Sequence, residues 1–354
     1  MTDLYIEGVT LSVSWRDTSL SLTDLIFETV RGAVDDSGQE MESIDSVVLA
    51  AHDLVDGRSL SSMVTAPAAA AYLRDEIRYG DDGAGAFAAA MTRLEAGHNQ
   101  RTVVAGWGRA SEHDVVAFSH SLFDPFIAGP VGLDELAVSA LRAQTWIQRH
   151  GSPDRERAAI ERRARAARNP RSVSANDIRQ SPPYPLTVDD LPRWADVAVG
   201  LVMSTEPGGV RVAGMGQSTD PYHLGDRDLV GMPALVDAVG KALAEAGTTV
   251  ADLDVVEIDT LTGFDEALAV EAIGLTPPGT GFGYAADTPG FNPSGGSAAG
   301  YCAPAMGLAR IAECVLQLRG SAGATQVDGA RRALATGSST IASQTHTAVV
   351  LEAS

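Results

Sequence analysis

Residues 292–304, NPSGGSAAGYCAP, combine a paired glycine, a third glycine and a tyrosine directly ahead of a long amphipathic stretch. Glycines at the start of a helix let the backbone approach a ligand closely. A phenol in such a turn, here Tyr301, can donate a hydrogen bond or exchange a proton with a substrate. The loop is therefore a candidate catalytic element.

The other residues capable of chemistry are few and scattered. Two cysteines, Cys302 and Cys314, leave no room for a disulfide framework or a cysteine-rich metal site. Cys302 is interpreted as a small buried thiol, with a nucleophile as the alternative. Three histidines, His98, His113 and His346, have no carboxylate or metal partner at a recognisable spacing, so structural roles are expected. We predict no metal site.

Composition limits the class of protein. The chain has 354 residues, of which 45% are apolar and 5% aromatic, as in a tightly packed α/β protein. A formal charge of −20 repels nucleic acid. The first residues show no signal peptide, and no apolar run reaches the roughly 18 residues of a membrane span. A cytoplasmic protein without a membrane span is expected.

Two parts of the chain have the same order of predicted elements. Residues 22–38 and 234–250 have helical apolar spacing, and each is followed by an apolar strand, around Val47 and Val255. A small-residue helix and another short strand follow in both parts. This repetition predicts a duplicated α/β unit with mainly parallel strands.

A less regular segment separates the two parts. We expect an N-terminal half at 1–109 with 197–214, a loop or insertion region at 110–196, and a C-terminal half at 215–354. Within the insertion, residues 154–171 predict a basic helix that ends at Asn169-Pro170. The helix is either a positive patch for coenzyme A phosphates or an ordinary solvated helix.

These motifs, taken in order, resemble the thiolase superfamily, and most closely its lipid-transfer-protein branch related to the sterol carrier protein X thiolase. The resemblance rests on residues 167–206, 254–275 and 292–327. It implies a thiolase fold, five-layered α/β/α/β/α from two duplicated halves. It also implies a dimer, no bound cofactor and a coenzyme A thioester as substrate.

The residues that thiolase chemistry requires are missing at every matched position. The nucleophilic cysteine at the start of a helix is replaced by Gly80, which has no side chain to acylate. Asp81 and Asp82 follow it, and we interpret them as helix caps. A histidine position is occupied by Asp259, and the carboxy-terminal cysteine is absent near Gly337-Ser338. A cysteine-dependent thiolase is therefore excluded in this register.

One branch of the family performs retro-aldol cleavage of β-hydroxyacyl-CoA thioesters with tyrosines in place of histidines. Tyr301 matches one of these tyrosines, and Asp259 occupies the place of the other. The expected catalytic pair is Asp259 as base and Tyr301 as donor. The remaining candidate residues, expected to bind the substrate or coenzyme A, are Ser294, Gly300, Gly337, Ser338, Trp107 and the oxyanion-forming backbone at Gly295 and Gly296.

A purely structural role remains an alternative for each of these residues. In that interpretation Asp259 and Tyr301 each serve only to stabilise the fold, and Trp107 is either a pocket wall or part of the core.

The favoured function is a thiolase-like subunit for lipid or steroid side-chain degradation within a heteromeric complex. The alternatives are a non-catalytic partner of an active thiolase or aldolase chain, and a lipid or sterol carrier. Expected partners are a second thiolase-like chain or a second copy, and a small OB-fold protein.

Overall fold

Five strands from the first part of the chain lie side by side in the order β3-β2-β4-β5-β1. β2 is parallel to β3 and β4, whereas β5 is antiparallel to β4 and β1. β2, β4 and β5 are buried along their whole length, as expected of their continuous apolar runs. The five strands span Leu4–Ser14 (β1), Ser46–Ala50 (β2), Asp75–Tyr79 (β3), Arg101–Arg109 (β4) and Asp196–Ser204 (β5).

The second part of the chain repeats this order. β6, β9, β8 and β7 are neighbours, and Phe291 forms a parallel bridge to Val256 of β7 in the place that β3 has in the first part. The predicted duplication is therefore present in the sheet itself. The strands span Val210–Thr219 (β6), Val255–Glu257 (β7), Arg332–Ser338 (β8) and Thr345–Ala353 (β9). The computed structural model describes residues 3–17, 19–174, 176–339 and 341–354.

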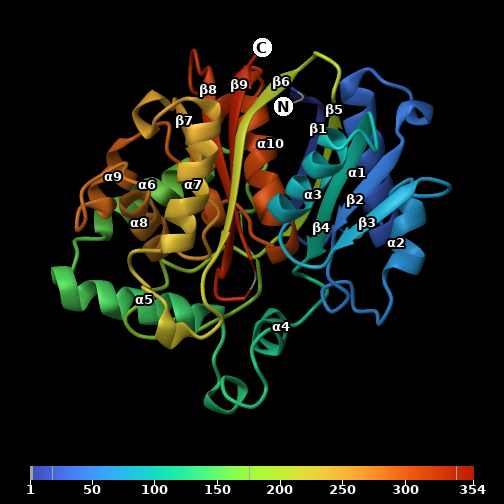
Figure 1. Cartoon of the computed structure of the whole chain (residues 1–354). Helices are drawn as coiled ribbons and strands as arrows, with labels where there is room; N and C mark the ends of the chain where they lie inside the picture. Colours follow the sequence, from blue (N-terminus) through green and yellow to red (C-terminus); the bar gives the residue numbers. More distant parts are fainter. Residues whose placement is uncertain (1–2, 18, 175, 340) are drawn as a thin grey trace.

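The helices arrange the two halves of the sheet into five layers (Figure 1). α1 (Leu22–Ser37) and α2 (Ser62–Ala68) lie on one outer face, and α7 (Pro233–Ala246) and α8 (Gly263–Ala272) on the other. Between them, α3 (Gly83–Glu95) and α10 (Met306–Leu318) contact each other and strands of both halves. β1 and β6 join the halves into one sheet by a short antiparallel pairing. The expected five-layered α/β/α/β/α fold is confirmed.

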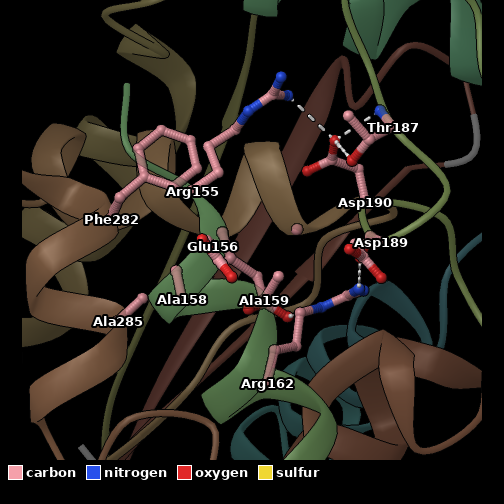
Figure 2. Close-up of a pocket in the computed structure, with 12 residues that line it drawn as sticks. Arg155, Glu156, Ala158, Ala159, Arg162, Thr187, Asp189, Asp190, Phe282 and Ala285 are labelled. Carbon is pink, nitrogen blue, oxygen red and sulfur yellow. Dashed lines mark hydrogen bonds and ion pairs between the residues drawn. The ribbon is translucent and has the colours of Figure 1, made fainter. Parts of the chain in front are cut away.

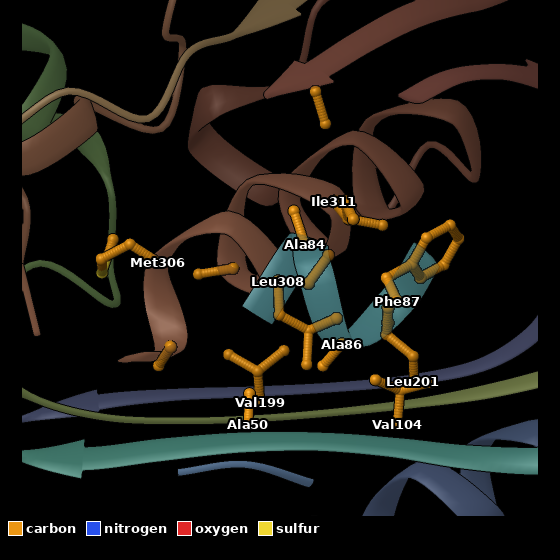
Figure 3. Close-up of a cluster of buried hydrophobic side chains, with 14 of the residues drawn as sticks. Ala50, Ala84, Ala86, Phe87, Val104, Val199, Leu201, Met306, Leu308 and Ile311 are labelled. Atoms are coloured by element: carbon orange, nitrogen blue, oxygen red, sulfur yellow. The ribbon is translucent and has the colours of Figure 1, made fainter. Parts of the chain in front are cut away.

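The central layer depends on small residues. α3 begins GAGAFAAA, and its buried face packs on α10 and on the strands beneath, as Figure 3 shows for Ala84, Phe87 and Leu308. A Cβ atom at Gly83 would lie 2.6 Å from the Cβ of Leu308, so only glycine permits this approach of α3 to α10.

Asp82 joins the starts of the two central helices. Its Oδ2 accepts a hydrogen bond from the N–H of Ala84 in α3 at 2.9 Å, and its Oδ1 accepts one from the N–H of Gly307 in α10 at 2.9 Å. The capping role expected of Asp82 is confirmed. Burial, with the nearby charges of Asp259 and Asp81, raises the pKa of the Asp82 carboxyl well above its usual value.

The segment between β4 and β5 carries α4 (Val115–Ser121), α5 (Glu135–His150) and α6 (Glu156–Arg168). Hydrogen bonds fix it to α8: Trp146 Nε1 donates to Glu271, and Arg162 Nε donates to Glu266. α5 and α6 thus lie against the second half of the fold, whereas Val115 and Phe118 of α4 belong to a core cluster that includes Val55 of the first half. The expected boundary at 196 falls on the first residue of β5, and the one at 214 falls within β6.

No helix in the described residues is long and apolar enough to cross a bilayer.

We predict opposite effects for two helical Gly→Ala substitutions. A Cβ at Gly307 would lie 2.4 Å from Asp82 Oδ2, so Gly307→Ala forces the central helices apart and should destabilise the fold by about 1–3 kcal/mol. Gly240 in α7 is exposed and an added Cβ would meet nothing within 4 Å. Gly240→Ala should therefore stabilise the protein by up to about 1 kcal/mol. Urea unfolding measures both, and equal effects would contradict the proposed close contact.

Candidate active site

A small cavity lies between the glycine turn, the end of β8 and the segment that follows β4. Its volume is about 40 Å³, enough for a few water molecules. Residues from both halves and from the insertion line it: Val55, His113, Val115, Phe118, Ser119, Leu122, Glu135, Trp194, Leu261, Tyr301, Cys302, Ala303, Pro304, Ser338, Ser339 and Ser343. The cavity brings together four of the residues singled out from the sequence: Tyr301, Ser338, His113 and Cys302.

Tyr301 is held firmly in the cavity wall. Its backbone N–H donates to the Arg193 carbonyl, and its carbonyl accepts from the Ala195 N–H. The phenol ring packs edge-on against Trp194, with ring centroids 5.6 Å apart. Burial, with the charge of Asp259 nearby, raises the pKa of Tyr301 well above its usual value. The phenol therefore stays protonated at neutral pH and can serve as a hydrogen-bond donor.

Asp259 lies behind the cavity wall and reaches it through Ser338. Its carboxylate accepts hydrogen bonds from the N–H and the hydroxyl of Ser338, both at 3.3 Å. Its own N–H donates to Thr336 Oγ1 at 3.1 Å. Burial raises the pKa of Asp259 to about 6, and the positive charge of Arg310 opposes part of that rise. The charge of Asp259 thus affects the pKa of Tyr301, but Asp259 is not one of the residues that line the cavity.

Glu135 is a cavity residue that the sequence did not reveal. It lies in the first turn of α5, and its Oε1 accepts a hydrogen bond from the Ala342 N–H at 2.6 Å. Burial raises the pKa of this carboxyl to about 8, so most of it is protonated at neutral pH. Glu135 belongs to no recognisable motif, because the fold brings it to Ala342 from a distant part of the chain.

His113 also lines the cavity. Its Nδ1 lies 2.7 Å from the Arg109 carbonyl oxygen, and its ring packs edge-on against Phe118. Burial lowers the pKa of His113, so the imidazole is neutral at pH 7. The sequence predicted a structural role for this histidine, and the structure adds a place beside Tyr301 in the same cavity.

The glycine pair lies outside the cavity. The Gly295 N–H donates to the Asn292 carbonyl, and the Gly296 N–H donates to Ser294 Oγ at 3.3 Å. Both N–H groups are thus engaged within their own loop, which packs against α6 and Glu266. This geometry does not support the oxyanion pocket expected of Gly295 and Gly296.

Ser294 and Gly300 have structural environments. Ser294 Oγ donates to Glu257 at 2.8 Å and accepts from Arg310 Nη1 at 2.7 Å, in a fully buried network. A Cβ at Gly300 would lie 2.6 Å from Val13, so this glycine permits close packing on β1. Neither residue lines the cavity.

The three remaining candidates have different surroundings. Trp107 is buried among side chains of α1 and the sheet, and its Nε1 donates to Asp56 at 3.1 Å. These contacts favour the interpretation of Trp107 as a core residue. A Cβ at Gly337 would lie 2.3 Å from Asp82 Oδ2, so Gly337 lies at the junction of the central helices. Gly80 is exposed, and an added Cβ there would meet nothing within 4 Å.

Neither cysteine has the character of a nucleophile. Cys302 lines the cavity and Cys314 is in the core, and both are buried and unpaired as free thiols. Burial raises the pKa of both thiols. Thiols in such surroundings remain protonated and unreactive. Within the described ranges, no group of three or more histidine, cysteine or acidic residues is arranged to hold a metal ion.

A larger cavity of about 380 Å³ lies between α6, α8, α9 (Gly281–Asp287) and the loop around residues 187–190 (Figure 2). Its arginines already have acidic partners. Arg155 Nη1 contacts Asp190 at 3.1 Å, and Arg162 donates to Glu266 at 3.2 Å and to the Asp189 carbonyl at 2.9 Å. Because Arg162 is buried, the predicted basic helix is not an ordinary solvated helix. The arginines of this cavity are already paired with carboxylates, which does not favour a phosphate site here.

Comparisons with known proteins agree with this architecture. Residues 216–352 match the family described as "Thiolase C-terminal domain-like". The chain is 26% identical to "Acetyl-CoA acetyltransferase" of Methanothermobacter thermautotrophicus over 365 residues, covering 93% of this chain and 94% of that protein. It is 40% identical to human "Sterol carrier protein 2" over 114 residues, which is 30% of this chain and 21% of that protein.

A solved structure extends the agreement over the whole fold. A chain of the "Ltp2-ChsH2(DUF35) aldolase" superposes with a TM-score of 0.82 at 19% identity, covering 99% of this chain and 98% of that chain. At this identity the match concerns the fold alone. The resemblance seen in the sequence is confirmed by these matches.

Proposed function

We propose that this homologue of the thiolases and of sterol carrier protein 2, which has the thiolase fold, acts on acyl-CoA thioesters as a carbon–carbon lyase of retro-aldol type. The observation that carries the proposal is the cavity itself. It contains the buried, protonated phenol of Tyr301 and the hydroxyl of Ser338, which is hydrogen-bonded to a carboxylate. The thiol that lines it, that of Cys302, has a raised pKa. That set suits proton transfer and enolate stabilisation, and it does not suit acyl transfer to sulfur.

The reaction needs few groups. The proton leaves the β-hydroxyl, the Cα–Cβ bond breaks, and the electron pair passes into the enolate of the thioester. The α-carbon then takes up a proton, giving a shorter acyl-CoA and an aldehyde or ketone. Tyr301 is proposed to donate its hydrogen bond to the enolate oxygen, where charge develops. Asp259 is proposed to act through Ser338, whose hydroxyl and N–H it fixes.

The solved relative supports the choice of reaction. The chain with the same fold belongs to an assembly named an aldolase, with Ltp2 and ChsH2 as its named components. We therefore include in the proposal a heteromeric complex, with a small OB-fold partner, and lipid or steroid side chains as the acyl groups. No bound cofactor is required for the steps above.

The narrow cavity favours a second candidate function. A volume of about 40 Å³ is far smaller than an acyl-CoA substrate needs, so a substrate must widen it or enter with a rearrangement of its walls. A non-catalytic subunit that supports an active thiolase-like chain needs no such opening. The two functions differ in whether Tyr301 affects turnover.

Replacing the phenol tests the proposed function. Tyr301→Phe removes the hydrogen-bond donor and keeps the ring, and should lower kcat/KM for β-hydroxyacyl-CoA cleavage by about 100- to 1,000-fold. Tyr284→Phe is the matched control, because Tyr284 is a partly buried tyrosine of α9 that packs on Phe291 outside the cavity. Turnover is followed by release of the aldehyde or ketone. Unchanged turnover in Tyr301→Phe would support the non-catalytic subunit instead.

The edge of the first half offers a surface for a second thiolase-like chain. β3 lies at the edge of the sheet, and large apolar side chains are exposed just before it. Met63 is 76% exposed, Tyr72 75% and Leu73 88%. An unpaired strand edge beside exposed apolar side chains is typical of an interface. We propose that a second copy of this chain pairs there.

Charge at this edge should abolish the pairing. Leu73→Lys with Met63→Lys should convert a dimer into a monomer, as measured by light scattering after size-exclusion chromatography. Val188→Lys is the control, because Val188 is 72% exposed on the insertion, far along the chain from β3. A wild-type chain that is monomeric alone, or a double variant that stays dimeric, would contradict self-pairing at β3.

A further inference from the structure

The cavity holds four titratable side chains in the described part of the chain: His113, Glu135, Tyr301 and Cys302. Burial raises the pKa of the glutamate, the tyrosine and the cysteine, so these three hold their protons at neutral pH. Burial lowers the pKa of the histidine. His113 is therefore the lining side chain able to accept a proton at pH 7.

The hydrogen bond at Nδ1 fixes which nitrogen is free. A backbone carbonyl only accepts, so the contact of 2.7 Å between His113 Nδ1 and the Arg109 oxygen requires the proton on Nδ1. In the neutral ring, Nε2 then carries the lone pair. No described residue is hydrogen-bonded to Nε2. The arrangement of a ring oriented by one nitrogen and basic at the other is the one that general-base histidines use.

The local fold fixes the ring itself. Arg109 is the last residue of β4, and Asp114 caps α4 by accepting from the N–H groups of Val116 and Ala117. His113 lies between these two anchors, with its ring against Phe118 at a centroid distance of 5.7 Å. The charged or titratable groups that act on it are Asp196, Asp114 and His52, and none of them forms a hydrogen bond to the ring.

From this geometry we infer that His113 is a catalytic residue, the general base that removes the β-hydroxyl proton of the substrate. The inference rests on the proposed lyase function and gives it the proton acceptor that Asp259, held behind Ser338, does not offer directly. The hydroxyl proton passes to Nε2, the C–O bond becomes a carbonyl, and the Cα–Cβ bond breaks. The imidazolium returns the proton to the α-carbon, while Tyr301 donates to the enolate oxygen. Atoms and charge balance without a further reactant.

Two variants of His113 separate catalysis from structure. In His113→Asn, the amide nitrogen takes the place of Nδ1 and keeps the bond to the Arg109 carbonyl, but the base is lost. We expect kcat to fall by about 100-fold or more with an unchanged Tm. His113→Ala should recover activity when imidazole is added, in proportion to the free base. His120→Asn is the matched control, since His120 lies on α4 and its Nδ1 also contacts a backbone carbonyl, that of Leu133, at 3.0 Å.

The outcomes distinguish the two levels of the proposal. A wild-type complex that cleaves no β-hydroxyacyl-CoA overturns the lyase function itself. A wild-type complex that cleaves it, together with a His113→Asn variant of normal kcat, overturns only the role of His113. Loss of kcat in His113→Asn without rescue of His113→Ala by imidazole would reduce His113 to a residue of structural importance and also overturn the inference.

Discussion

The meeting of two helix starts at one buried carboxyl group is the constraint on which the rest of the structure depends. Asp82 accepts one backbone N–H from α3 and one from α10, so the positive ends of both helix dipoles converge on it. The glycines around it, Gly83, Gly307 and Gly337, leave the space that this convergence needs. The two halves of the sheet are thereby held on either side of a shared helical layer.

The chemistry of the cavity follows from the same junction. A thiolate can be stabilised at the start of such a helix, but here the buried carboxyl group of Asp82 caps the start of α3. Buried carboxyl groups placed near one another raise one another's pKa, as Asp259 and Asp81 do for Asp82. The raised pKa values of Asp259, about 6, and of Glu135, about 8, result from burial and from this crowding of carboxyl groups. The site is suited to moving protons at neutral pH.

The sequence predicted the fold well, because the fold depends on local periodicity. Helical and strand spacing recur in both halves, and the duplicated strand order follows from them. The site was predicted only in part. Tyr301 was singled out because it stands in a glycine-rich motif, and the structure places it in the cavity wall. Glu135 and His113 lie in the irregular insertion and reach the same cavity through tertiary contacts alone. The prediction for the glycine pair failed in the opposite way. Gly295 and Gly296 form a recognisable motif, but their N–H groups donate within the loop and are not free to form an oxyanion pocket.

The central claim is that this cavity breaks a carbon–carbon bond by proton transfer, without a covalent intermediate on sulfur. The most direct test incubates the protein, alone and with a co-expressed thiolase-like chain as the proposed partner, with a β-hydroxyacyl-CoA in deuterated water and follows product and protein by mass spectrometry. The account predicts an aldehyde or ketone and a shortened acyl-CoA with one deuterium on its α-carbon, and a protein of unchanged mass. An acyl adduct on Cys302, or no cleavage in either preparation, would contradict it.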